Sequence, residues 1–184
     1  MRKLSELEGI CLGIVARHKT CTAYRVRQEL KDSPSSHWQA SAGSVYPLLT
    51  RLETRQLIMA KAAGNDRRGT RQLQVTRKGA AALRKWIRTG ADADAVSSIS
   101  DPVRSRMFFL KSLGRAERVR YLEAAIERMQ DYLEETRTHL ARKRAAGDRY
   151  DYFGSLGATM VTEARLKWLK RVRAELDHHP ATGR

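Results

Sequence analysis

The fold is decided by residues 44–53, which read SVYPLLTRLE. Apolar residues recur there at steps of three and four, and this spacing predicts one buried face of a helix. They are Val45, Leu48, Leu49 and Leu52, followed beyond the stretch by Leu57 and Ile58. Pro47 falls in or near the first turn, where a missing N–H is least harmful, and Ser41 or Ser44 can cap the helix. We therefore expect a helix that buries one side.

The other side of this helix is polar and aromatic. It carries Ser44, Tyr46, Pro47, Thr50 and Arg51. Side chains of this kind at the start of a helix suit base edges and phosphates in a DNA major groove. For Tyr46 the alternative is a place in the core with only its hydroxyl at the surface. The stretch predicts a recognition helix.

Two helices are expected before it. The first covers about residues 4–18, where Ser5 and Glu8 fit a capping box. Its apolar face comprises Leu4, Leu7, Ile10, Cys11, Ile14 and Val15. The second begins at Thr20 or Thr22, either of which is a suitable N-cap. Its apolar side comprises Tyr24, Val26 and Leu30.

A hairpin and a fourth helix are expected after it. Two β-type segments, 59–63 and 70–76, flank a turn cluster at 64–69, which is typical of a β-hairpin. Its tip and edge carry Arg67, Arg68 and Arg71. The fourth helix runs from about residue 77 to 88, with an apolar side made of Leu83, Trp86 and Ile87. This order of elements is that of a winged helix-turn-helix, with the hairpin as its wing.

The charge of the chain is unevenly distributed. Its 184 residues carry 36 Lys and Arg against 20 Asp and Glu, a formal net charge of +16. Residues 1–90 hold 18 basic and 6 acidic residues, a net of +12, and residues 91–184 hold 18 and 14, a net of +4. Such an excess favours nucleic acid as a partner before an anionic membrane surface. Because most of it lies on the winged-helix half, we expect double-stranded DNA and no membrane association.

Three groups of residues are expected to contact DNA. The polar side of the recognition helix reads the major groove, and the wing arginines reach phosphates or the minor groove unless they belong to a solvated loop. In the second helix Arg25, with Arg27 and Lys19, adds phosphate contacts unless that face is merely solvated. The expected DNA-binding residues are Ser41, Ser44, Tyr46, Pro47, Thr50, Arg51, Tyr24, Arg25, Arg67, Arg68 and Arg71.

The remainder of the chain is expected to be helical. Residues 91–101, ADADAVSSISD, are small, polar and acidic and precede Pro102, so they predict a linker between a domain at 1–90 and a helical region at 102–184. The fold class is mostly α with a small β-hairpin. Apolar periodicity predicts a short helix at about 103–113 that packs on its neighbours, and long helices at 116–144 and 152–176.

The two long helices are expected to form a dimer. Their apolar stripes exceed what a small winged-helix body can cover, so a second copy is the expected partner, with an intramolecular hairpin as the alternative. The expected dimerisation residues are Leu122, Ile126, Met129, Leu133, Val161, Trp168, Leu169 and Val172. A homodimer would present two recognition helices about one duplex turn apart, roughly 34 Å, to a palindromic operator.

Nothing in the sequence indicates catalysis or metal binding. Cys11 and Cys21 are isolated, no Cys-x-x-Cys occurs, and His178 and His179 have no partners at ligand spacing. Nucleophile-elbow, P-loop and dinucleotide-binding motifs are absent from the sequence. We expect no enzyme, no metal and no cofactor. Without a signal-peptide core or an apolar stretch of about 20 residues, the chain is expected to be cytoplasmic.

Four stretches resemble the PadR-type transcriptional regulators. They are residues 4–15, residues 23–24 with 29–30, residues 44–53, which are the most specific, and residues 76–79, TRKG. The resemblance implies a winged helix, dimerisation through C-terminal helices and a small, often aromatic, effector. Trp168 and Met160 are the candidates for lining its pocket, with ordinary core packing as the alternative.

The sequence departs from the family pattern at three points. Ala23 stands where the family usually has Gly before the Tyr of the second helix, and Gln56 stands where it usually has a Gly that closes the recognition helix. Leu73 and Gln74 replace a Tyr that often precedes the Thr of the wing. The function expected from the residues and the resemblance is a dimeric DNA-binding repressor. A non-specific nucleic-acid-packaging protein and a protein-interaction adaptor built on a winged helix are the alternatives.

Overall fold

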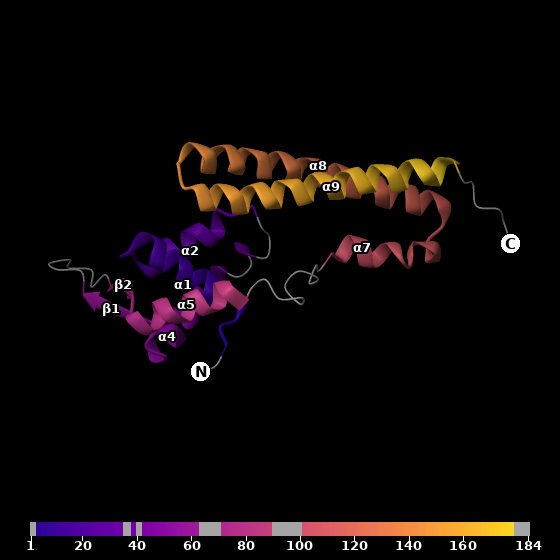
Figure 1. Cartoon of the computed structure of the whole chain (residues 1–184). Helices are drawn as coiled ribbons and strands as arrows, with labels where there is room; N and C mark the ends of the chain where they lie inside the picture. Colours follow the sequence, from indigo (N-terminus) through magenta and orange to yellow (C-terminus); the bar gives the residue numbers. More distant parts are fainter. Residues whose placement is uncertain (1–2, 35–37, 40–41, 63–70, 90–100, 179–184) are drawn as a thin grey trace. The chain divides into compact units, whose positions relative to one another are not determined.

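The structure is a computed structural model that describes residues 3–34, 38–39, 42–62, 71–89 and 101–178 (Figure 1). The chain divides into two compact units, Met1–Ile99 and Ser100–Arg184, which are described separately here. None of the described helices contains an apolar stretch long enough and poor enough in charge to cross a membrane. The expected linker, 91–101, lies outside the described residues except for Asp101.

The first unit has the expected order of helices and hairpin. Its elements are α1 (Glu6–His18), α2 (Ala23–Lys31), the short 3-10 turn η1 (Ala42–Ser44), α4 (Val45–Thr54), β1 (Ile58–Ala62), β2 (Arg71–Val75) and α5 (Arg77–Thr89). The capping box is confirmed, because the Ser5 hydroxyl accepts from Glu8 N–H at 3.3 Å and the Glu8 carboxylate accepts from Ser5 N–H at 3.0 Å. Thr22 caps α2 by accepting from Arg25 N–H at 3.2 Å.

The helices and the hairpin enclose one apolar core. It is made of Leu4, Cys11, Leu12, Ile14, Val15, Cys21, Val26, Leu30, Val45, Leu48, Leu49, Leu52, Leu57, Ile58, Leu73 and Ala82. Leu83 and Trp86 of α5 pack against it, as predicted. Two predicted apolar positions are wrong: Tyr24 is 60% exposed and Ile87 is also exposed, because each points away from the side of its helix that meets the core. Burial raises the pKa of the Cys11 thiol to about 12, so Cys11 is a neutral apolar side chain.

The recognition helix ends earlier than its apolar pattern predicted. α4 stops at Thr54, and Ile58 already begins β1. The exit is a Schellman turn, in which Leu57 N–H donates to Leu52 O at 2.9 Å and Gln56 N–H donates to Glu53 O at 2.7 Å. Gln56 occupies the left-handed position with φ 59°, where glycine is usual. Leu57 and Ile58 are therefore core residues of the turn and the hairpin.

The wing is a two-stranded antiparallel sheet that is tied to the helical body. β1 and β2 pair from Ile58 opposite Val75 to Ala62 opposite Arg71, and the connecting turn lies outside the described residues. On its other edge Leu73 pairs with Cys21, through Cys21 N–H to Leu73 O at 3.2 Å and Leu73 N–H to Cys21 O at 2.7 Å. The base of the wing is thereby anchored at the start of α2.

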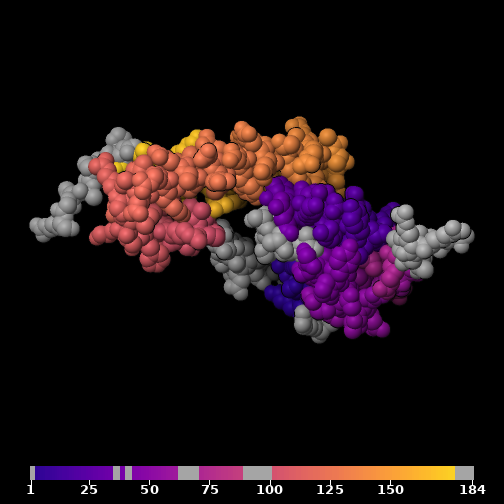
Figure 2. Space-filling view, turned by 180° about the vertical axis from the view of Figure 1, so that it is seen from behind, coloured from indigo at the N-terminus to yellow at the C-terminus, as the bar shows by residue number. Residues whose placement is uncertain are grey.

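The second unit is a helical hairpin with a short preceding helix. Its elements are α7 (Pro102–Met107), the 3-10 turn η2 (Leu110–Ser112), α8 (Arg115–Ala145) and α9 (Arg149–His178). α8 and α9 lie side by side (Figure 1), and Figure 2 shows α8 at the front with parts of α9 behind it. Their shared core comprises Leu122, Met129, Leu133, Leu166 and Leu169. The turn between them contains Gly147 at φ 78°.

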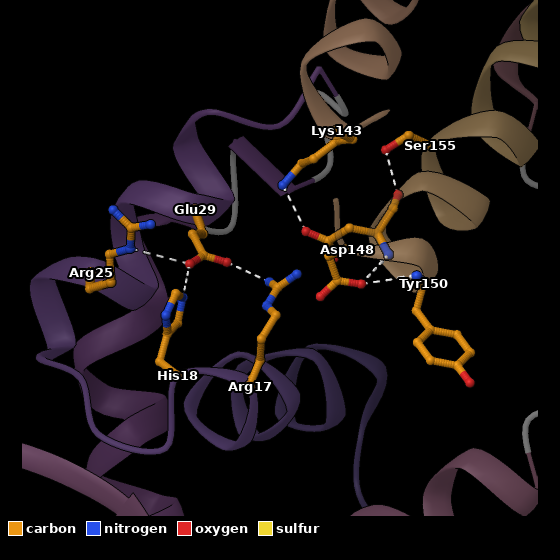
Figure 3. A network of polar contacts seen from close by, with 9 residues as sticks. Arg17, His18, Arg25, Glu29, Lys143, Asp148, Tyr150 and Ser155 are labelled. Atoms are coloured by element: carbon orange, nitrogen blue, oxygen red, sulfur yellow. Dashed lines mark hydrogen bonds and ion pairs between the residues drawn. The ribbon is translucent and has the colours of Figure 1, made fainter. Parts of the chain in front are cut away.

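The start of α9 is held by polar contacts that Figure 3 shows in close-up. Asp148 Oδ1 accepts from Tyr150 N–H at 2.9 Å and from Asp151 N–H at 3.1 Å, which caps the helix. Lys143 of α8 pairs with Asp151 at 2.9 Å across the turn. These contacts hold the reversal of the chain between α8 and α9 at residues 145–148.

The short helix of this unit differs from its prediction. α7 ends at Met107, and Phe108 and Phe109 are exposed where packing had been expected, because the chain leaves the helix there and continues into η2. Asp101 is a buried part of the unit instead of the end of a linker. It caps α7 and accepts from Arg165 Nε at 2.8 Å and Nη2 at 2.7 Å, which ties α7 to α9.

Candidate nucleic-acid interface

The exposed side of α4 carries the residues that the sequence pointed to. Ser44, Tyr46, Pro47, Thr50 and Arg51 are all exposed, whereas the other side of the helix is buried in the core. Tyr46 is 50% exposed, so the alternative of a core position is wrong for this residue. Ser44 precedes the helix, but its hydroxyl makes no capping hydrogen bond, and Ser41 lies outside the described residues. Thr50 Oγ1 donates back to Tyr46 O at 3.1 Å.

The carboxyl end of α4 is fixed to three other elements. Glu53 pairs with Arg71 of β2 at 2.6 Å, and Arg55 pairs with Glu8 of α1 at 3.0 Å. Thr76, just before α5, donates its hydroxyl to Gln56 O at 2.7 Å. Because these contacts reach α1, β2 and the residue between β2 and α5, the polar side of α4 has a set orientation relative to the wing and to α1.

Glu8 is the most buried charged group of this unit. Its side chain is only 1% exposed. Its Oε2 accepts hydrogen bonds from Arg55 Nη1 and from Ser5 N–H, both at 3.0 Å. A buried carboxylate is tolerated when it is paired and hydrogen-bonded in this way. The sequence revealed Glu8 only as a helix cap, because its second role depends on a residue 47 positions away.

The wing contributes one described arginine. Arg71 lies at the start of β2 with its side chain 62% exposed, and its guanidinium pairs with Glu53. Arg67 and Arg68, the wing-tip arginines, lie outside the described residues. Arg71 therefore joins the wing to the recognition helix, which the alternation of the strand did not predict.

A second cluster of charges surrounds Glu29 on α2 (Figure 3). Its carboxylate accepts from Arg17 at 2.5 Å, from Arg25 at 3.3 Å and from the His18 ring. Arg25 and Tyr24 both remain exposed at the start of α2, as DNA-contacting residues must be. Burial, with a further contribution from Glu29, raises the pKa of the nearby Cys21 thiol. Glu29 thus links the end of α1 to α2, a contact that the sequence analysis missed.

Metal-ligating side chains do not gather in the part of the chain that the structure describes. In those residues no group of three or more His, Cys, Asp and Glu side chains could hold a metal ion. Both cysteines are buried and free.

The predicted dimerisation residues separate into two sets. Leu122, Met129, Leu133 and Leu169 are buried between α8 and α9, and Ile126, Trp168 and Val172 are half-buried against the same core. The hairpin of a single chain buries the first four and covers the other three only in part, so the burial of the first four does not require a second copy. Val161 is exposed, as is Met160, whereas Trp168 packs in the hairpin, so the two candidate ligand residues have different surroundings.

The first half of α9 is apolar on its outside as well as its inside. The exposed residues recur at steps of three and four and form what we call the outer stripe of α9: Tyr150, Phe153, Gly154, Gly157, Met160, Val161 and Ala164. The ring centroids of Tyr150 and Phe153 are 6.4 Å apart, and the Arg149 guanidinium lies 5.2 Å from the Phe153 ring. Helical spacing alone does not separate this stripe from the inner face, because both recur at steps of three and four.

Comparison with known proteins identifies both units. Residues 11–85 match the model of the transcriptional regulator PadR-like family, and residues 100–177 match the model called virulence activator alpha C-term. No curated protein matches the sequence. The two matches leave residues 86–99 between them, and most of the stretch expected to be a linker falls in this interval.

Several solved structures share this fold. PadR from Bacillus subtilis in complex with operator DNA is 17% identical, with a TM-score of 0.79 over 94% of this chain and 99% of that one. The PadR-like regulator from Bacillus cereus is 18% identical, with a TM-score of 0.75 over 95% and 98%. PadR from B. subtilis in complex with p-coumaric acid is 18% identical, with a TM-score of 0.75 over 93% and 95%. The first unit of this chain thus matches the model of the transcriptional regulator PadR-like family, and the chain as a whole has the fold of the solved PadR structures.

Proposed function

We propose that this transcriptional regulator is a sequence-specific repressor that binds double-stranded DNA in the cytoplasm as a homodimer. The observation that carries the proposal is the exposed polar side of α4, which stands next to the wing on a half of the chain with a net charge of +12. The existence of a similarly folded relative in complex with operator DNA supports it. We propose DNA binding and no enzymatic activity, in keeping with the match of residues 11–85 to a family of transcriptional regulators.

Each part of the surface has a proposed task. Ser44, Tyr46, Pro47, Thr50 and Arg51 enter the major groove and read bases. Phosphate and minor-groove contacts come from α2, from the residue that precedes η1 and from the wing. These residues are Tyr24 and Arg25, then Ser41, and then Arg67, Arg68 and Arg71. If a dimer neutralises about eight phosphates, the logarithm of the association constant falls against the logarithm of salt with a slope of about −7.

The proposed dimer uses the outer stripe of α9. A second copy is the proposed occupant because the stripe is long, apolar and interrupted by two glycines that let another helix approach closely. Replacing Val161 with Glu is expected to give a monomer in sedimentation experiments while the hairpin stays folded, since Val161 is exposed. Lys170→Glu, on the exposed side of the same helix, is the control. A Val161→Glu protein that remains dimeric contradicts the assignment.

We also propose release of DNA by a small aromatic ligand bound in the helical unit, near Trp168 and Met160. A similarly folded PadR in complex with p-coumaric acid supports this ligand class. Titration of Trp168 fluorescence with p-coumaric acid tests it, with Trp38 and Trp86 replaced by Phe. A signal that does not respond, together with DNA binding that the compound leaves unchanged, refutes this ligand.

Selection of bound sequences from a random duplex pool tests the central proposal. We expect recovery of one palindrome whose half-sites lie about one helical turn apart. Recovery of no preferred sequence, with equal affinity for random duplex, favours a packaging protein instead. A protein that retards no duplex at low salt favours an interaction adaptor.

A further inference from the structure

The Glu53–Arg71 ion pair joins the two DNA-facing elements of the first unit. Arg71 Nη2 lies 2.6 Å from Glu53 Oε1, and the two side chains are 62% and 32% exposed. Glu53 stands in the last turn of α4, where the negative end of the helix dipole disfavours a carboxylate. Helix stability therefore does not explain this glutamate, and its contact with the wing does.

The chemistry of this pair resembles that of a phosphate contact. A guanidinium binds a carboxylate or a phosphate through the same planar fork of N–H donors. An exposed ion pair is worth little in free energy, so Arg71 can exchange one anion for the other at small cost. The Arg55–Glu8 pair cannot exchange in this way, because Glu8 is almost fully buried.

We propose that Glu53 is an intramolecular competitor of DNA for Arg71. In the free protein Glu53 holds the guanidinium beside the recognition helix, and a backbone phosphate replaces the carboxylate when the wing reaches the duplex. This inference rests on the proposed DNA-binding function. It makes Glu53 a positioning residue that limits affinity for every duplex and thereby keeps non-specific binding weak.

Salt-dependent DNA binding by the full chain tests the proposal, with the selected operator and a random duplex as probes. The variants are Glu53→Gln, Arg71→Gln and the double variant. Glu163→Gln is the matched control, because it removes the same charge from a similarly short, exposed pair with Arg137, at 2.7 Å, in the other unit. Thermal unfolding of each variant checks that the fold is intact.

The expected results differ between the variants. Glu53→Gln tightens binding of the dimer to both duplexes about two- to thirtyfold, since two exposed ion pairs no longer compete. Arg71→Gln weakens binding and reduces the salt slope by about 1.8, for two lost phosphate contacts. In the Arg71→Gln background Glu53→Gln has no further effect, and Glu163→Gln changes affinity less than about twofold. Glu53→Ala gives the same direction of change as Glu53→Gln.

Three results overturn the proposal. If Glu53→Gln tightens binding equally without Arg71, Glu53 merely repels DNA. If Glu53→Gln weakens binding or leaves it unchanged while Arg71 is present, the pair holds the wing in its DNA-binding position instead. A wild-type protein that retards no duplex overturns the proposed function itself, and this outcome is visible before any variant is compared.

Discussion

Gln56 should limit the stability of the DNA-binding unit. It occupies the left-handed position of the Schellman turn after α4, with φ 59°. For a residue with a Cβ, this backbone conformation costs about 1 kcal/mol or more of conformational free energy, whereas for glycine it does not. Gln56→Gly should therefore stabilise the folded unit, although the glycine also adds freedom to the unfolded chain.

The structure sets the size of the expected gain. The Gln56 side chain makes one long hydrogen bond, in which Lys78 Nζ donates to its Oε1 at 3.4 Å, so little is lost when it is removed. The backbone contacts of the turn, including Thr76 Oγ1 to Gln56 O at 2.7 Å, are kept. The relieved backbone strain favours the folded unit, and the added entropy of the unfolded chain opposes part of this gain. The net increase in the free energy of unfolding is about 0.5–1 kcal/mol.

Urea unfolding measures this gain. Trp86 packs against the core of the unit and reports its unfolding by fluorescence when Trp38 and Trp168 are replaced by Phe in every protein compared. Gln56→Ala is the control, because it removes the same side-chain contact but keeps the Cβ at positive φ. We expect the Gly variant to unfold at a higher urea concentration than the wild type, with an unchanged m-value. The midpoint of the Ala variant should not rise. Equal stability of the Gly and Ala variants would show that the positive φ at residue 56 costs no stability.

Three further predictions concern packing, an ion pair and charge. Gly79→Ala should destabilise the first unit by about 3 kcal/mol or more in the same urea assay, because its Cβ would lie 1.9 Å from Leu57 O; a loss under about 1 kcal/mol contradicts this. Burial by itself would raise the pKa of Asp101, but hydrogen bonds from two backbone N–H groups and from Arg165 hold it below its ordinary value. The stability from this pair is thus present above the ordinary carboxyl pKa of about 4 and is lost as pH falls through the lowered value. Asp101→Asn should therefore cost about 1–3 kcal/mol at pH 7 and progressively less in acid, whereas a loss that does not depend on pH argues against the ion pair. Replacing both wing-tip arginines with Ala should flatten the salt slope of DNA binding by about 3.6 for a dimer without altering sequence preference, and an unchanged slope contradicts their assignment.

Local patterns were sufficient for the elements of the first unit. A capping box at Ser5, the steps of three and four in α4 and the alternation around Leu73 each concern residues within one turn or one strand of each other. Since such neighbours share a face whatever the rest of the chain does, their pattern predicts the element directly. The exposed residues of α4 follow from the same argument, because the side opposite a buried stripe faces solvent.

The contacts that orient these elements could not be predicted in this way. Glu8 and Arg55 are 47 positions apart, Glu53 and Arg71 are 18 apart, and Asp101 and Arg165 are 64 apart. Each charged residue had several possible partners, and an ion pair forms only where packing brings two of them within about 4 Å. The unexpected exit of α4 has a similar cause, because the core accepts Leu57 only if Gln56 turns the chain through positive φ.

The helical unit shows most clearly what local sequence patterns predict and what depends on packing between distant residues. Apolar periodicity was enough to predict long amphipathic helices at 116–144 and 152–176, since periodicity is a property of each segment alone. It could not predict that the inner stripes of the two helices cover each other within one chain, or that the outer stripe of α9 is left exposed, because these depend on how the helices pack. Hydrophobic burial is non-directional, so an apolar stripe specifies that it must be covered but not by what.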